Sequence, residues 1–137
     1  MTDVFSQEKR SWIMSRVKGR DTKPETLVRS FIFRMGLRFR LHRRDLPGTP
    51  DIVLPRHRKV VFVHGCFWHG HKNCPRSKRP TTNEDFWNSK LDGNMERDKR
   101  YLRELRKTGW KVLIVWECET KSPGKLLRKL EGFLHEE

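Results

Sequence analysis

Two apolar runs constrain this chain more than any other feature of its sequence. One is KVVFV at residues 59–63, and the other is WKVLIVW at residues 110–116. Apolar residues that follow one another without polar alternation are typical of strands covered on both faces. We therefore expect two central strands, each lying in a sheet with helices on both sides.

A helix is predicted over residues 23–35. Thr22 and Glu25 have the spacing of a capping box, and a proline lies in the first turn. Apolar residues then follow at helical spacing until Gly36, which is typical of a helix end.

The remaining patterns complete the order of elements. They predict a strand at 37–41 with alternating apolar and basic residues, a turn LPGTP, a strand at 51–54, a charged segment at 83–108 with an imperfect helical stripe, and a helix at 125–134. Gly93 leaves open whether the charged segment is one helix or two. This order favours an α/β fold in which helices flank a central mixed β-sheet.

The length and the apolar fraction limit the number of domains. A chain of 137 residues with 34% hydrophobic residues can bury one core but not two. We expect a single domain over residues 22–137. Residues 1–21 are polar and basic with scattered apolar positions, which predicts a basic N-terminal arm without a core of its own.

The charge balance predicts a polyanionic partner. Lys and Arg number 31 against 17 Asp and Glu, which gives a formal net charge of +14. Nucleic acid is the expected partner, with an acidic membrane surface or a merely solvated arm as alternatives. Candidate phosphate contacts are Lys9, Arg10, Arg16, Lys18 and Arg20 in the arm and the clusters at 56–59 and 76–79.

Targeting signals and cysteine usage indicate the compartment. No stretch approaches the roughly 18 consecutive apolar residues of a membrane span, and MTDVFSQEKRSW has no signal-peptide apolar region. We expect a cytoplasmic protein with no membrane partner. Three cysteines cannot form a complete disulfide framework there, so metal binding or plain burial are the alternatives for them.

Asp51 is a candidate ligand for a divalent cation. It follows Pro50 at the start of a predicted strand, and a rigid strand end fixes the direction of a carboxylate ligand. A hydrogen bond to the local backbone of the turn is the alternative. His64 and His69 follow the next strand, and an imidazole can accept a proton from an attacking water or stabilise charge on a phosphate. Either histidine has the alternative of ligating zinc or filling a packed corner.

Four residues form a candidate zinc set, namely Cys66, His71, Cys74 and Cys118. Three thiolates and one imidazole are the ligands of a closed tetrahedral site, and a metal would hold a polar loop that has little core. Cys118 has the alternative of being a small buried residue. His69 is the rival of His71 as the fourth ligand.

Aromatic residues at the loop tip are candidate DNA contacts. Phe67 and Trp68 lie between polar residues, and Trp87 follows downstream. Planar rings can wedge between base pairs, and a mispaired step costs less to open than a paired one. The alternative is a small hydrophobic cluster beneath the loop.

Several segments together resemble one family. They are SWIMSRVKGRDTKPE, LPGTPDIVLP, KVVFVHGCFWHGHKNC, NEDFWNSKLDGNMERDKR and GWKVLIVWECE, which are in family order and span nearly the whole chain. They resemble the very short patch repair endonucleases, whose fold is similar to that of restriction endonucleases. The resemblance implies a DNA mismatch endonuclease that nicks one strand 5′ to the thymine of a T:G mispair and leaves a 3′-hydroxyl and a 5′-phosphate.

The resemblance also implies catalytic roles. Asp51 would bind catalytic Mg²⁺ together with the main-chain carbonyl of Val63, and Glu25 would take part through metal-bound water. His69 would be the general base, and His64 its supporting or phosphate-contacting partner. The strand after Asp51 reads VVFVH, without the acid and lysine usual in restriction-like enzymes, so a lysine-assisted scheme cannot operate.

Further implied roles concern structure and DNA. The implied structural zinc ligands are Cys66, His71, Cys74 and Cys118. The implied wedge residues are Phe67, Trp68 and Trp87, and Met14 in the arm would contact the opposite groove. The family suggests a monomer acting on double-stranded DNA, with mismatch-repair proteins as further partners.

Two other functions are compatible with the same residues. One is a restriction-like nuclease with a different mismatch or sequence preference, which the same metal centre would serve. The other is a zinc-stabilised DNA-binding module without catalysis. The joint presence of Asp51, His64 and His69 opposes the module, because binding alone does not require them.

Overall fold

The computed structural model describes residues 22–135 as an α/β fold. Its helices and strands, in chain order, are α2 (Lys23–Arg34), β1 (Arg40–Leu41), β2 (Ile52–Leu54), β3 (Lys59–His64), α3 (Glu84–Lys107), β4 (Lys111–Trp116) and α4 (Pro123–Leu134). Short 3-10 turns, η1 (Pro55–His57), η2 (Pro75–Ser77) and η3 (Glu117–Lys121), lie in the connections. The predicted basic arm, residues 1–21, lies outside the described residues.

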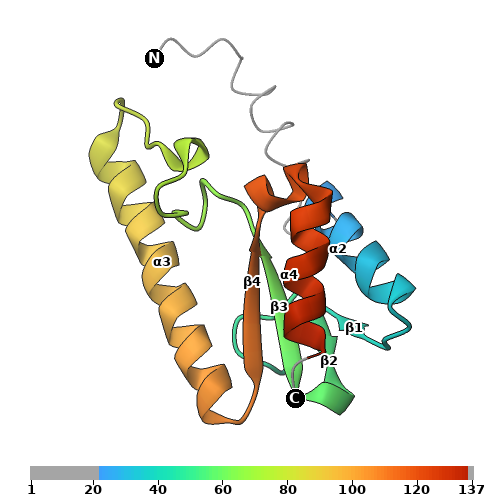
Figure 1. The fold of residues 1–137 in the computed structure, drawn as a ribbon. Helices are drawn as coiled ribbons and strands as arrows, with labels where there is room; N and C mark the ends of the chain where they lie inside the picture. The colour runs from blue at the N-terminus through green and yellow to red at the C-terminus, as the bar shows by residue number, and fades with distance from the viewer. Residues whose placement is uncertain (1–21, 136–137) are drawn as a thin grey trace, which may run out of the picture.

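The strands form one mixed sheet within residues 22–135, in the order β1-β2-β3-β4 (Figure 1). β1 and β2 pair antiparallel, β2 and β3 pair antiparallel, and β3 and β4 pair parallel. The parallel pair needs a long crossover connection, and α3 lies in it. The predicted mixed sheet flanked by helices is confirmed.

Helices cover the two faces of the sheet unequally. Successive side chains of a strand point to opposite faces, so each strand supplies residues to two separate clusters. On one face, α2 and α4 pack against the sheet through Val28, Ile32, Ile52, Leu54, Val61, Val115, Leu126, Leu130 and Leu134. On the other face, α3 and the residue that precedes β4 pack against the sheet, and this cluster consists of Val53, Val60, Phe62, Leu105 and Trp110. Each fully buried aliphatic side chain contributes about 1.5–3 kcal/mol by leaving water.

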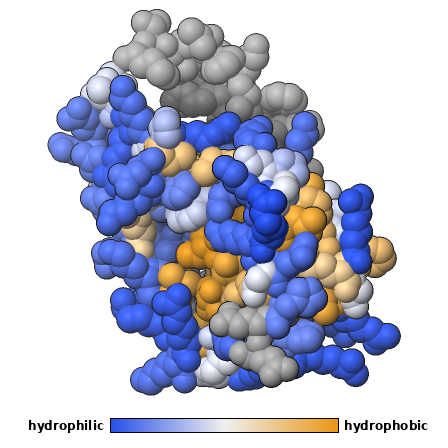
Figure 2. Space-filling view, viewed as in Figure 1, coloured by the Kyte–Doolittle hydropathy of each residue, from blue (hydrophilic) through white to orange (hydrophobic). Residues whose placement is uncertain are grey.

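Figure 2, in the same view, shows hydrophilic side chains along α3 and apolar side chains between α3 and α4, where β4 lies. Within residues 22–135, no helix combines the length and the apolar character that a membrane span requires.

Helix α2 begins where the sequence predicts, with the Thr22 half of the predicted capping box, while the Glu25 carboxylate accepts from Arg29. The hydroxyl of Thr22 accepts a hydrogen bond from the backbone N–H of Glu25 at 3.3 Å, and Pro24 lies in the first turn. Glu25 precedes Val28 by three residues and Ile32 by seven, so its side chain lies on the buried face of the helix. This places a carboxylate at the edge of the core, beside the sheet.

Helix α3 is one continuous helix of 24 residues. Gly93 lies inside it, and a side chain at that position would meet nothing within 4 Å. A glycine costs about 1 kcal/mol relative to alanine in a helix, and the helical turns on both sides of Gly93 offset this cost. The question left open by Gly93 is therefore settled in favour of one helix.

The first strand is shorter than predicted. Of residues 37–41, only Arg40 and Leu41 pair with β2, while Leu37 and Phe39 pack against the core without strand pairing. His42 has a φ of 50°, in the left-handed region, so the chain leaves the sheet directly after Leu41. The prediction of a strand over 37–39 is wrong. The alternation of apolar and basic residues shows which side chains are buried, but it does not show how many residues form hydrogen bonds with β2.

Candidate functional site

Asp51 and Val63 meet across the antiparallel pair of β2 and β3. The Oδ2 atom of Asp51 accepts a hydrogen bond from the backbone N–H of Val63 at 2.6 Å. The Asp51 side chain is 13% exposed, so one oxygen is fixed by backbone while the carboxylate faces a cleft. The predicted alternative, a bond to the local turn, is not what holds this side chain, because Val63 is 12 residues away.

A second carboxylate and a histidine lie beside Asp51. Possible ligand atoms of Glu25, His42 and Asp51 all lie within 4.8 Å of one another, and we call these three residues the carboxylate cluster. The Nε2 atom of His42 is 3.4 Å from Oε2 of Glu25, and its Nδ1 atom is 3.8 Å from Oδ1 of Asp51. Three separate segments therefore converge, as predicted for Asp51 and Glu25 but not for His42.

The surroundings of Asp51 favour a cation. Burial raises the pKa of the Asp51 carboxyl to about 7, and the nearby charge of Glu25 adds to the rise. The hydrogen bond from Val63 and the charge of Arg29 oppose the rise without cancelling it. Two buried carboxylates at this distance repel each other when both are ionised, and a bound cation relieves that repulsion.

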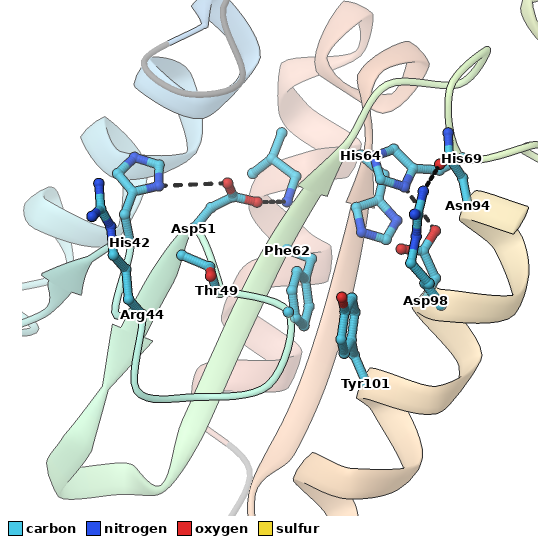
Figure 3. A pocket seen from close by; sticks show the side chains of 13 residues that line it. His42, Arg44, Thr49, Asp51, Phe62, His64, His69, Asn94, Asp98 and Tyr101 are labelled. Carbon is cyan, nitrogen blue, oxygen red and sulfur yellow. Dashed lines mark hydrogen bonds and ion pairs between the residues drawn. The ribbon is translucent and has the colours of Figure 1, made fainter. Parts of the chain in front are cut away.

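His69 and Asp98 form a pair on the other side of the cleft (Figure 3). The Nδ1 atom of His69 donates to Oδ2 of Asp98 at 2.7 Å. An ionised carboxylate only accepts, so the ring proton of neutral His69 lies on Nδ1 and the lone pair on Nε2 remains for another proton. This is the arrangement of a general base with an orienting acid.

Sequence reasoning missed Asp98, although the sequence carries a signal for it. Asp98 follows Met95 by three residues and precedes Leu102 by four, so it lies on the predominantly apolar stripe of α3 that faces the sheet. A carboxylate at such a position needs a polar partner in the interior. That partner comes from the loop after β3, which sequence spacing alone does not place.

His64 lies behind His69. The two imidazole rings stack with their centroids 3.8 Å apart and their planes at 8°. His64 is only 6% exposed, and within residues 22–135 its Nδ1 atom has no hydrogen-bond partner. Burial, with a smaller contribution from the charge of His69, lowers the pKa of His64 to about 3. His64 is therefore neutral near pH 7 and offers a ring nitrogen rather than a positive charge.

Two clefts meet at these histidines. One, of about 510 Å³, has Asp51 on one side and His69 with Asp98 on the other (Figure 3). The second, of about 430 Å³, is lined by Glu25 and by aromatic side chains of the loop after β3. The lining residues common to both clefts are Val63, His64 and His69. The end of β3 thus forms the wall between a polar cleft and a partly aromatic one.

The predicted zinc ligands come together at one end of the sheet. Ligand atoms of Cys66, His71, Cys74 and Cys118 lie within 4.8 Å of one another, and we call this set the Cys/His cluster. β3 and β4 run parallel, so Cys66 after β3 and Cys118 after β4 leave the sheet at the same edge. The set does not include His69, which pairs with Asp98 instead. His71 is thus the imidazole of the cluster.

The chemistry of the Cys/His cluster suits a soft metal ion. Its three cysteines, all among the described residues, form no disulfide. Burial raises the pKa of the Cys66 thiol to about 12, which a cation bound to the sulfur would reverse. The His71 ring stacks on Trp116 with centroids 4.1 Å apart. Three sulfurs and one nitrogen around one point are the donor set of structural zinc sites.

The loop aromatics form a mutual cluster that remains partly exposed. The ring centroids of Phe67, Trp68 and Trp87 are separated by 5.1, 5.6 and 6.0 Å. Phe86, which was predicted as part of the helical stripe and not as a DNA contact, continues the cluster with its ring 5.2 Å from Trp87 and is 59% exposed. Rings in tilted and edge contact pack on one another, yet Phe67 and Trp68 also line the second cleft.

Helix α3 anchors the aromatic loop. The side-chain amide of Asn94 donates to the carbonyl of Trp68 at 3.1 Å. Gly70 has a φ of 62°, and a Cβ atom there would lie 2.6 Å from the sulfur of Met95. Only glycine combines this conformation with such close packing. Met14, the predicted arm residue, lies outside the described residues.

Comparisons with known proteins identify the class. The family model of DNA mismatch endonuclease Vsr matches residues 2–76. A type II nicking enzyme of Xanthomonas oryzae pv. oryzae, V.XorIIP, is 48% identical over 134 residues, which are 98% of either chain. DNA mismatch endonuclease Vsr of Escherichia coli (strain K12) is 44% identical over 126 residues, which are 92% of this chain and 80% of that protein.

Another relative is the type II nicking enzyme V.NmeAIP of Neisseria meningitidis, which is 45% identical over 136 residues, covering 99% of this chain and 96% of its own length. Taken with a cleft that joins carboxylates to histidines, these relatives define a DNA endonuclease. The chain belongs to the Vsr family.

Proposed function

We propose that this endonuclease nicks one strand of double-stranded DNA on the 5′ side of the thymine in a T:G mispair and so initiates very short patch repair. We base this on one observation above all. The His69–Asp98 pair and the Asp51 carboxylate face each other across one cleft, and the aromatic loop lines the adjoining cleft. Chemistry and base-pair recognition would then meet at the end of β3.

His69 would act as the general base. Its Nδ1 atom is bound to Asp98, so Nε2 accepts a proton from the water that attacks the phosphodiester. Asp98 stabilises the imidazolium that results and keeps the ring oriented. The attack breaks the bond between phosphorus and the 3′-oxygen, so the water oxygen becomes part of the 5′-phosphate. The departing 3′-oxygen takes up a proton from solvent water and becomes the 3′-hydroxyl, and His69 returns its proton to solvent.

The oxygen donors at Asp51 fit Mg²⁺. The residues that would hold it are Asp51 through Oδ1, Val63 through its main-chain carbonyl and Glu25 through water, because hard cations prefer oxygen ligands. When bound, Mg²⁺ supplies charge stabilisation at the attacking and leaving oxygens. The Val63 N–H fixes Oδ2 of Asp51 and so turns the other oxygen to the cleft.

His64 would support the base rather than act as one. Its ring stacks on His69 at 3.8 Å and limits the orientations open to that ring. Because burial keeps His64 neutral, it would contact a phosphate oxygen through a ring N–H and not through charge.

Mispair selection would come from the aromatic loop and the arm. Phe67, Trp68 and Trp87 would wedge into the duplex beside the mispair, where unstacking costs least, and Met14 would contact the opposite groove. The formal charge of +14 would draw the protein to the DNA backbone, mostly without base choice.

The remaining parts of the proposal concern structure. Zn²⁺ in the Cys/His cluster would hold the loop after β3 against η3. We further propose a restriction-endonuclease-like fold for a single catalytic domain over 22–137, a monomeric state and contacts with mismatch-repair proteins. The family membership supports these statements, together with a mixed sheet covered on both faces.

End-labelled duplexes test the proposal. One duplex carries a central T:G mispair and the other is fully paired, and each is incubated with the protein with and without Mg²⁺. Nicking of the thymine strand alone, directly 5′ of the mispair and only with Mg²⁺, is expected. Asp51→Asn should abolish it, and a variant as fast as the parent would refute the metal assignment.

Two other outcomes favour the alternatives. Cleavage of both duplexes would indicate a nuclease with another mismatch or sequence preference, which the names of the nicking relatives make the second candidate. Retained binding without any cleavage would indicate a DNA-binding module, and the catalytic proposal would fall.

A further inference from the structure

Arg29 connects two groups of the carboxylate cluster. One of its nitrogens, Nη2, lies 2.9 Å from Oε2 of Glu25 and 3.0 Å from Nε2 of His42. A guanidinium group can only donate, so Nε2 of His42 accepts from Arg29 and the proton of the neutral ring lies on Nδ1. The Arg29 and His42 side chains are 18% and 15% exposed, so this bridge lies at the edge of the interior.

The other ring nitrogen of His42 faces Asp51. Its Nδ1 atom is 3.8 Å from Oδ1 of Asp51, too long for a hydrogen bond but within reach of a small shift (Figure 3). The second oxygen of Asp51 already accepts from the Val63 N–H. One N–H group from β3 and one from His42 therefore flank the same carboxylate.

The backbone of His42 is held in an uncommon conformation. Its φ of 50° lies in the left-handed region, which a residue with a Cβ atom enters at a cost. The backbone N–H of His42 donates to the carbonyl of Asp51 at 3.2 Å, so the strained residue is tied to the residue that its ring faces. Strain of this kind persists where the surrounding structure enforces it, often beside functional groups.

We propose that Arg29 and His42 are positioning residues that hold Glu25 and Asp51 in register for the divalent cation. The inference rests on the proposed function, because that function requires a cation at Asp51. His42 is not itself a ligand, since Arg29 occupies the lone pair of Nε2 and Nδ1 carries the proton. Groups that hydrogen-bond or orient metal ligands typically contribute roughly 10- to 100-fold in metal affinity.

Mn²⁺ binding tests the inference without measuring activity. The free Mn²⁺ signal is followed by electron paramagnetic resonance during titration of the full-length, zinc-loaded protein in complex with nicked T:G duplex. Arg29→Met and His42→Leu are expected to weaken Mn²⁺ binding roughly 10- to 100-fold. Arg34→Met is the matched control, because it removes the same charge from an exposed position on the same helix.

Conservative variants distinguish a role in orienting the metal ligands from a role in stabilising the fold alone. His42→Gln supplies an oxygen that accepts from Arg29 and an N–H that reaches Asp51, so it should bind Mn²⁺ more tightly than His42→Leu. Arg29→Lys keeps the charge, but its ammonium lies on a shorter and more flexible side chain and does not reproduce the position of Nη2, so it should bind Mn²⁺ more weakly than the parent even if Arg29→Met fails to fold. Thermal melts show whether Mn²⁺ affinity merely follows stability, which would refute the inference.

The outcomes separate the inference from the proposed function. If the parent protein binds Mn²⁺ and nicks T:G duplex while Arg29→Lys and His42→Leu bind Mn²⁺ equally well, only the positioning roles are refuted. If the parent neither binds Mn²⁺ nor nicks, the proposed function fails and the inference fails with it. A nicking deficit of the variants that shrinks as Mg²⁺ rises supports the inference.

Discussion

The Cys/His cluster and the carboxylate cluster are assembled in different ways. Three ligands of the Cys/His cluster come from one loop of nine residues, Cys66–Cys74, and only Cys118 is distant in sequence. The carboxylate cluster draws Glu25, His42 and Asp51 from a helix, a turn and a strand start. A local cluster is visible in sequence spacing, whereas a convergent one depends on the folded sheet.

The two clusters also differ in what a metal would contribute. The Cys/His cluster crosslinks a loop with little apolar packing, so its metal would contribute stability. The carboxylate cluster lies beside a packed core, where Val28 and Ile32 are fully buried, so its metal would contribute chemistry. Substitutions in the cleft should therefore lower the nicking rate. Substitutions in the Cys/His cluster should instead loosen the loop after β3.

The largest expected effect is on rate. His69→Ala should lower the single-turnover nicking rate on T:G duplex roughly 10²- to 10⁴-fold, because the proton acceptor is lost. Its melting temperature and zinc content should stay close to those of the parent. His57→Ala, at an exposed position in η1, is the control. A His69→Ala rate close to the parent's would mean that another group is the base.

The next effect is on stability, away from both clusters. Leu130→Ala should lower the free energy of unfolding by about 2–5 kcal/mol, because Leu130 is fully buried between α4 and the sheet. Urea denaturation measures this, with the exposed Lys125→Ala as the control. The folded variant should nick at the parent's rate. A slower rate would show that packing between α4 and the sheet also affects the geometry of the cleft.

A smaller effect is expected on selectivity. Trp68→Ala should reduce the preference for T:G over paired duplex roughly 5- to 150-fold, the equivalent of about 1–3 kcal/mol of lost stacking. The ratio of kcat/KM values on the two duplexes measures it. Phe33→Ala removes a 74% exposed aromatic from α2 and serves as the control. Equal losses on both duplexes would assign Trp68 to general binding.

The smallest expected effect is local. Cys118→Ser should bring zinc below one equivalent and speed amide exchange in residues 64–76 about tenfold, which corresponds to about 1.4 kcal/mol. Exchange in α4 serves as the internal control. Full zinc occupancy with unchanged exchange would remove Cys118 from the cluster and weaken the contrast between the two sites.

The sequence predicted the elements whose signals are local. The continuous apolar runs at 59–63 and 110–116 predicted β3 and β4, because a strand covered on both faces needs apolar residues in sequence. The cap and stripe of α2 placed that helix to within a residue. Residues 37–39 failed, because side-chain alternation records burial and not hydrogen bonding between strands.

The site was predictable only in part. Motif residues such as Asp51, His64 and His69 were identified, and the structure brings them to one pair of clefts. Their partners Arg29 and Asp98 were not, because each is an ordinary charged residue on a helix until the fold sets its orientation. Which charged side chain pairs with a motif residue depends on distances between segments in the folded protein, and the spacing of residues along the chain does not give these distances.

Successive residues of strand β3 point to opposite faces of the sheet, so a folding error that shifts the strand by one residue would affect both the core and the active site. Phe62 and His64 face α3, while Val61 and Val63 face α2. A slip of β3 by one residue against β2 would exchange these faces and carry the imidazole of His64 away from His69. The same slip would turn Phe62 out of its cluster, so the misaligned sheet would lose the packing of Phe62 as well as the ring that stacks on the general base. The β3 register that gives the best core packing is therefore also the register that places His64 beside His69, so core packing selects against chains with a misassembled active site.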